Sequence, residues 1–100
     1  MRTKEVKNDD GSHFGWAIKC PGCCDYHIFD NRWTFNGDME RPTFIASMLS
    51  KMSYTNGRPD SVCHSYVTDG RIEFLGDCTH DLKYKTVDLP DIDPMWNEKQ

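Results

Sequence analysis

Apolar and polar residues alternate in short stretches along this chain, which is the pattern of strands that bury one face. The clearest early example is "HFGWAIK", residues 13–19, in which Phe14, Trp16 and Ile18 are separated by smaller or polar residues. This stretch leads directly into Cys20. The pattern therefore predicts a strand over residues 13–19 that places Cys20 at its end.

The middle of the chain, "PTFIASMLSKMSY" at residues 42–54, is less decisive. Its apolar residues fit the period of a helix about as well as that of a strand. Turn signals flank it at hairpin spacing: "NGD" at 36–38, where Asn-Gly accepts the positive φ angles of a type I′ turn, and "TNGRPD" at 55–60. We therefore expect a strand in this region.

The stretch "VCHSYVTDGRIEFLGDC", residues 62–78, predicts the clearest hairpin, because Asp69-Gly70 favours a type I′ turn between two β-rich runs. With a two-residue loop, Thr68 faces Arg71, and side chains alternate between two faces. One face, which we expect to be buried, carries Cys63, Ser65, Val67, Ile72, Phe74 and Cys78. The other carries His64, Tyr66, Glu73 and Asp77. A turn one residue longer would invert this assignment.

After this hairpin, Asp77 is a good N-cap for a short helical turn, "CTHDLKY", whose first turn contains His80. "KTVDLP", residues 85–90, predicts a last short strand. The expected fold is mainly β: a small antiparallel meander of hairpins stapled by one zinc site, with at most one or two short helical turns. It forms a single domain over residues 1–100, with flexible ends at 1–12, a frayed or edge segment, and 93–100.

A chain of 100 residues with 37% hydrophobic residues builds only a thin core. A domain of this size buries roughly 60–70% of the surface that its unfolded chain exposes, and small folds often need a disulfide or a metal. No apolar run approaches the roughly 20 residues that cross a bilayer, so we expect no membrane span and a cytoplasmic location. There the five cysteines are more typical of metal ligands or free thiols than of disulfides.

The segment "CPGCCDYH", residues 20–27, places thiols at the spacing of a zinc knuckle, in which two intervening residues let both sulfurs reach one ion. Two more ligands must come from elsewhere, and the predicted hairpin supplies them. Our first choice for a Zn²⁺ site is Cys20, Cys23, Cys63 and His80. The alternatives that stay open are His64, His27 and Cys78.

Four motifs together resemble a small family of uncharacterised proteins encoded by phages and prophages, often labelled "ammonia monooxygenase" by automated methods. The motifs are "CPGC…H", "WTFNGDMERPTF", "CHSYVTDGRIEFLGDCTH" and "TVDLP". The resemblance implies a zinc-binding domain and a phage context, and it singles out Trp33, Asn36, Pro42 and Thr43. The monooxygenase label does not fit, because that enzyme is a membrane-embedded copper protein and this chain has no spanning segment.

These features favour a non-catalytic binding module that acts on a host or phage macromolecule, such as an inhibitor of a host enzyme or defence system in the bacterial cytoplasm. We expect a protein partner, with a binding surface at Trp33, Asn36, Arg41, Pro42 and Thr43.

One alternative is a small zinc-dependent hydrolase, in which His64, Asp77 and His80 supply a ligand or a general base. Ser65 beside His64 does not indicate a catalytic triad, because adjacent strand residues point to opposite faces. A second alternative is a nucleic-acid-binding zinc ribbon, which the net charge of −4 disfavours.

Overall fold

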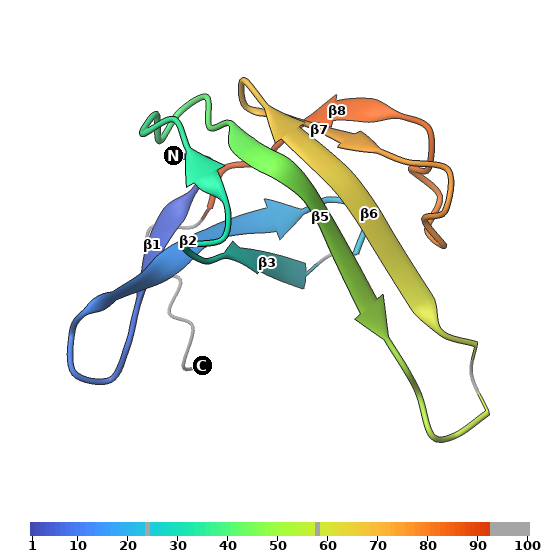
Figure 1. The fold of residues 1–100 in the computed structure, drawn as a ribbon. Helices are drawn as coiled ribbons and strands as arrows, with labels where there is room; N and C mark the ends of the chain where they lie inside the picture. The colour runs from blue at the N-terminus through green and yellow to red at the C-terminus, as the bar shows by residue number, and fades with distance from the viewer. Residues whose placement is uncertain (24, 58, 93–100) are drawn as a thin grey trace.

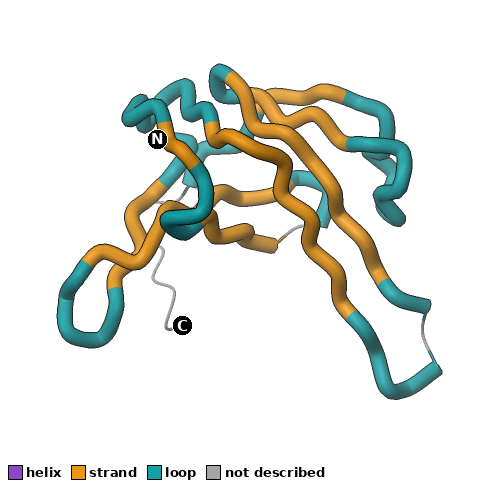
Figure 2. Tube along the Cα trace, viewed as in Figure 1, coloured by secondary structure: helices purple, strands orange, loops and turns teal. Residues whose placement is uncertain are grey.

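The computed structural model describes residues 1–23, 25–57 and 59–92, and within them the chain forms β-strands and no helix (Figure 2). It follows that no described helix could span a membrane. The predicted flexible end at 93–100 lies outside the described residues. The strands are β1 (Lys4–Lys7), β2 (His13–Cys20), β3 (Asp25–Phe29), β4 (Thr34–Phe35), β5 (Phe44–Met52), β6 (Ser61–Thr68), β7 (Arg71–Phe74) and β8 (Thr86–Asp88).

Two antiparallel sheets make up the fold (Figure 1). One has the order β1-β2-β3 and the other the order β4-β5-β6-β7-β8, so within each sheet every strand pairs with its neighbours in sequence. This confirms the predicted mainly β meander. The strands expected at 13–19, 42–54 and 85–90 correspond to β2, β5 and β8.

The β6–β7 hairpin has the register that the sequence predicts. Thr68 pairs with Arg71 and Tyr66 with Glu73, and the two turn residues have φ angles of 54° at Asp69 and 77° at Gly70. L-residues rarely adopt such angles, and glycine and aspartate tolerate them best. Every residue assigned to the buried face is buried, including Ser65 and Cys78.

Two local expectations differ from the structure, and a third is met in part. The helical turn after Asp77 is absent, and this segment forms irregular turns in which the Lys83 amide bonds the His80 carbonyl. Residues 36–43 form a longer connection between β4 and β5 than a two-residue type I′ turn. Residues 1–12, expected to be a frayed or edge segment, contain the edge strand β1, in which Val6 is buried.

The core lies between the sheets and is centred on aromatic rings. Phe29 from β3 stacks on Phe44 from β5 at a centroid distance of 4.2 Å, and Trp33 meets the edge of Phe29 at 5.3 Å. Such pairs add roughly 0.5–1.5 kcal/mol each beyond the burial of their area. The aromatic contacts therefore join the two sheets at the start of β5.

Candidate catalytic triad and metal centre

A bulge in β5 sets the position of Ser47. Phe44 pairs with Val67 and Met48 pairs with Ser65, so residues 45–47 of β5 stand opposite Tyr66 alone. Such bulges bend a strand and re-aim the side chains within it. The Ser47 carbonyl accepts a hydrogen bond of 3.1 Å from the indole nitrogen of Trp33, which holds the bulge against the aromatic core.

The Ser47 side chain reaches a histidine–aspartate pair. Ser47 Oγ lies 3.2 Å from His64 Nε2, and His64 Nδ1 lies 3.0 Å from Asp77 Oδ2. An ionised carboxylate only accepts hydrogen bonds, so Nδ1 carries the ring proton and Nε2 is free to accept one from the Ser47 hydroxyl. This is the arrangement and polarity of a Ser–His–Asp catalytic triad, which is recognised by geometry and not by sequence order.

Hydrogen bonds between the Cys78 side chain and the His64 main chain keep the histidine beside the aspartate. His64 projects from the outer face of β6, and Asp77 follows β7 on the neighbouring turn. The Cys78 sulfur accepts from the His64 amide and donates to the His64 carbonyl, both at 3.2 Å. The side chains of His64 and Asp77 are 25% and 53% exposed, so solvent and a substrate have access to the site.

A second cluster lies on the inner face of the same strand. The ligand atoms of Cys20, Cys23, His27 and Cys63 all lie within 4.8 Å of one another. Cys20 ends β2, His27 lies in β3 and Cys63 in β6, so the cluster joins the two sheets. The ligand atoms of Cys63, Cys78 and His80 also lie within 4.8 Å of one another and form an adjoining group.

The cluster contains one thiol that ionises readily and a buried ring nitrogen without a partner. The Cys63 thiol donates a hydrogen bond to Cys20, with the sulfurs 3.7 Å apart, and this lowers the pKa of Cys20 to about 4. The same bond raises the pKa of Cys63 well above its usual range, because ionisation would remove the donor. Nε2 atoms of His27 and His80 are buried without a hydrogen-bond partner. A buried polar atom left unpaired costs about 1–3 kcal/mol, and a coordinated cation would satisfy it.

The structure thus distributes the predicted metal ligands differently from the sequence. Three thiols of the first-choice set, those of Cys20, Cys23 and Cys63, do converge. The histidine grouped with all three is His27, whereas His80 is grouped with Cys63 and Cys78. His64 belongs to neither group, because it faces Ser47 and Asp77.

The residues expected to form a binding surface have other contacts. Trp33 packs on the core and Pro42 is fully buried. Asn36 accepts from the Thr43 amide, and the Thr43 hydroxyl accepts from the Asp69 amide, so both order the loop beside the β6–β7 turn. Arg41 is exposed and pairs with Asp69 at 2.8 Å.

Sequence reasoning missed Ser47. The chain has no G-x-S-x-G nucleophile motif, and Ser47 lies 17 residues before its histidine, on another strand. Ser65, which was excluded because it alternates with His64, is indeed buried on the opposite face. No local pattern in residues 42–54 marks the bulge that turns Ser47 outward.

The family model described as "Bacterial ubiquitination-like system serine protease (BubE)" matches residues 2–75. The match includes Ser47 and His64 and ends two residues before Asp77. No curated protein and no solved structure matches the chain. The expectation of a non-catalytic binding module is therefore wrong, because the matched family is one of proteases. The hydrolase alternative fits better, and the match gives no support for a phage context.

Proposed function

The chain belongs to BubE, the family of bacterial ubiquitination-like system serine proteases, and from this premise we propose that it is a serine protease with Ser47 as its nucleophile. The observation that supports this most strongly is the unbroken hydrogen-bond chain from Ser47 through His64 to Asp77. The family description supports a protein of a ubiquitination-like system as the substrate.

Each triad residue has a defined role in the proposed reaction. Ser47 Oγ forms a bond to the scissile carbonyl carbon while its proton passes to His64 Nε2. Asp77 orients the imidazole and stabilises the imidazolium that forms. The carbon–nitrogen bond then breaks as His64 returns the proton to the leaving amine, which leaves an ester on Ser47. Water, deprotonated by His64, hydrolyses the ester and restores the free hydroxyl.

A small serine-reactive phosphonate tests this proposal without knowledge of the substrate. Attack of Ser47 Oγ on a fluorophosphonate forms an oxygen–phosphorus bond and expels fluoride, while His64 takes the proton. We expect stoichiometric labelling at Ser47, detected by mass spectrometry of the tryptic peptide. Ser47→Ala should abolish labelling, and the matched variant Ser50→Ala, three residues along the same strand, should retain it. A wild-type chain that is not labelled would overturn the proposal.

We also propose that the inner cluster holds a structural zinc ion through Cys20, Cys23, Cys63 and His27. A set of three thiolates and one imidazole is a closed zinc shell of the structural kind, and the unpaired His27 Nε2 supports the choice of histidine. When bound, zinc supplies a cross-link between the sheets, and the chemistry of the reaction stays with the triad. The described cysteines are free thiols, which supports a reducing cytoplasm as the compartment.

Metal analysis tests the zinc site and its ligands. We expect one zinc per purified chain by plasma mass spectrometry. His27→Ala should release zinc to a chromophoric chelator faster than wild type, and the matched variant His80→Ala should not. The reverse ranking would show that His80 is the fourth ligand, and a chain without stoichiometric zinc would contradict the site altogether.

A further inference from the structure

Exposed apolar side chains gather beside the triad. The described residues include eight large hydrophobic residues that are exposed, and four of them lie on β5 and β6, the strands that carry Ser47 and His64. They are Ile45, Leu49, Met52 and Tyr66. Ile45 and Leu49, 62% and 49% exposed, lie two residues before and two residues after Ser47.

Three of these side chains, Ile45, Leu49 and Tyr66, lie on the face from which the triad opens, whereas Met52 pairs with Ser61 on the opposite face. Leu49 pairs with His64 across the two strands, and Tyr66 is the residue opposite the bulge that contains Ser47. Leaving such side chains in water is unfavourable relative to burying them against another apolar surface. Their position on both sides of the nucleophile therefore favours a ligand that covers them while its carbonyl meets Ser47.

The edge of β5 offers main-chain hydrogen bonds next to the same residues. Among the described strands, β4 pairs with β5 only at Phe44 and Ile45. Beyond the bulge β5 continues through Met52 with β6 on one side alone (Figure 1). An extended peptide can add to such an edge as a further strand, with affinity from the main chain and specificity from alternate side chains.

We infer that the substrate binds as an extended strand along the free edge of β5, with large apolar side chains against Ile45 and Leu49 on either side of the scissile bond. This inference rests on the proposed protease function and adds the class of sequence that the site accepts. The partner chemistry is an unfolded or tail-like polypeptide segment rich in leucine, valine or similar residues. A folded domain without such a segment does not fit the edge.

Peptidyl diphenyl phosphonates test the inference, because Ser47 attack on phosphorus expels phenol and its rate reports peptide binding. We expect a leucine-rich peptide to label Ser47 about tenfold to a hundredfold faster than a serine- and aspartate-rich one, which is the usual discrimination of apolar subsites. Methylation of one backbone nitrogen of the leucine-rich peptide at a time should slow labelling at least at one position. Unselective rates would overturn the inference.

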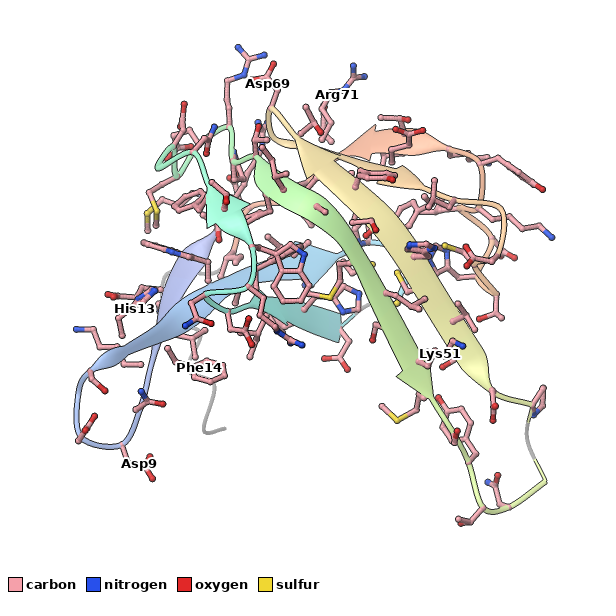
Figure 3. All side chains as sticks on the ribbon, viewed as in Figure 1. Asp9, His13, Phe14, Lys51, Asp69 and Arg71 are labelled. Carbon is pink, nitrogen blue, oxygen red and sulfur yellow. The ribbon has the colours of Figure 1, made fainter. Side chains whose placement is uncertain are left out.

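Variants separate this inference from the protease function itself. Ile45→Lys and Leu49→Lys should abolish the preference for the leucine-rich peptide, whereas the small fluorophosphonate should still label Ser47 in both variants. The matched change Ile28→Lys, at an exposed isoleucine on β3, and the charge reversal Lys51→Glu near the end of β5 (Figure 3) should keep the preference.

Labelling by the fluorophosphonate without any peptide preference would contradict the inference and leave the protease proposal intact. If neither reagent labels Ser47, the protease proposal itself is wrong. Light scattering gives a further outcome. If the wild-type chain is a dimer, Ile45→Lys makes it a monomer and the peptide preference persists, then a second copy of the chain covers these apolar residues. In that case the inference is wrong.

Discussion

The two faces of β6 carry different chemistry in consecutive residues. Cys63 faces inward and, like Cys20 and His27, is less than a tenth exposed. His64, the next residue, faces outward and meets Ser47 and Asp77 at a face that solvent reaches. A strand turns successive side chains to opposite sides. One strand can therefore contribute Cys63 to the largely buried thiol–imidazole cluster and His64 to the solvent-accessible triad.

The two regions also differ in what holds them together. The inner cluster joins β2, β3 and β6 through side chains that converge on one point. The outer triad is joined by two side-chain hydrogen bonds, each of which typically contributes only about 0.5–1.5 kcal/mol of net stability. We therefore expect the triad to depend on the cluster for its geometry, whereas the cluster does not depend on the triad.

Removal of the metal should have the largest effect and should disable both regions. Structural zinc contributes about 10–16 kcal/mol of apparent binding energy in small domains, which matches or exceeds the usual stability of a domain, about 5–15 kcal/mol. A strong chelator should collapse the thermal unfolding transition in circular dichroism and stop labelling of Ser47. An unchanged melting curve after verified zinc removal would contradict the expectation that the triad depends on the cluster.

Ser47→Ala should disable the outer region alone. Loss of a triad nucleophile lowers kcat by about 10⁶ in a serine protease, and we expect a comparable loss of turnover on the cleaved substrate. The free energy of unfolding should change by only about 1 kcal/mol, because one hydrogen bond is removed. Zinc content should equal that of wild type, and a variant that loses zinc would show that the cluster depends on the triad after all.

Asp77→Asn should leave the structure of both regions in place and impair proton transfer through His64. An amide can donate to His64 Nδ1 and favour the wrong tautomer, a change that lowers kcat by about 10⁴ in a well-studied protease. Because the Asp77 side chain is half-exposed, we expect a loss of about 10²–10⁴ in kcat. Asp81→Asn, an exposed acid four residues later, is the control, and equal effects of the two changes would exclude a triad role.

Trp33→Phe should have the smallest effect and act on the bulge that links the regions. The substitution keeps a ring against Phe29 but removes the indole donor to the Ser47 carbonyl. One neutral hydrogen bond is worth about 1 kcal/mol, so we expect about a fivefold fall in kcat with little change in KM. Trp16→Phe, at a ring that packs on Phe35, controls for loss of aromatic area and should be near neutral in turnover.

Much of the fold was predictable because its signals are local. Asp69-Gly70 defined the β6–β7 turn, and alternation then assigned Cys63 to the buried face and His64 and Asp77 to the other, as observed. The helical turn after Asp77 was predicted wrongly, since the Asp77 carboxylate binds His64 and the main chain there bonds β6 and β7. The Asp77 carboxylate thus binds His64 on a neighbouring strand instead of capping a local helical turn.

The sequence by itself determined the mainly β character, the hairpin register and the thiol knuckle, because each depends on residues a few positions apart. Only the tertiary structure decided that Ser47 meets His64, and that His27 joins Cys20, Cys23 and Cys63 in the inner cluster. Both outcomes depend on how separate strands align. The β5 bulge shifts that alignment, and the hydrophobic pattern of residues 42–54 does not indicate where the bulge lies. Strand alignment is set by packing across the whole core, which no short window of sequence contains.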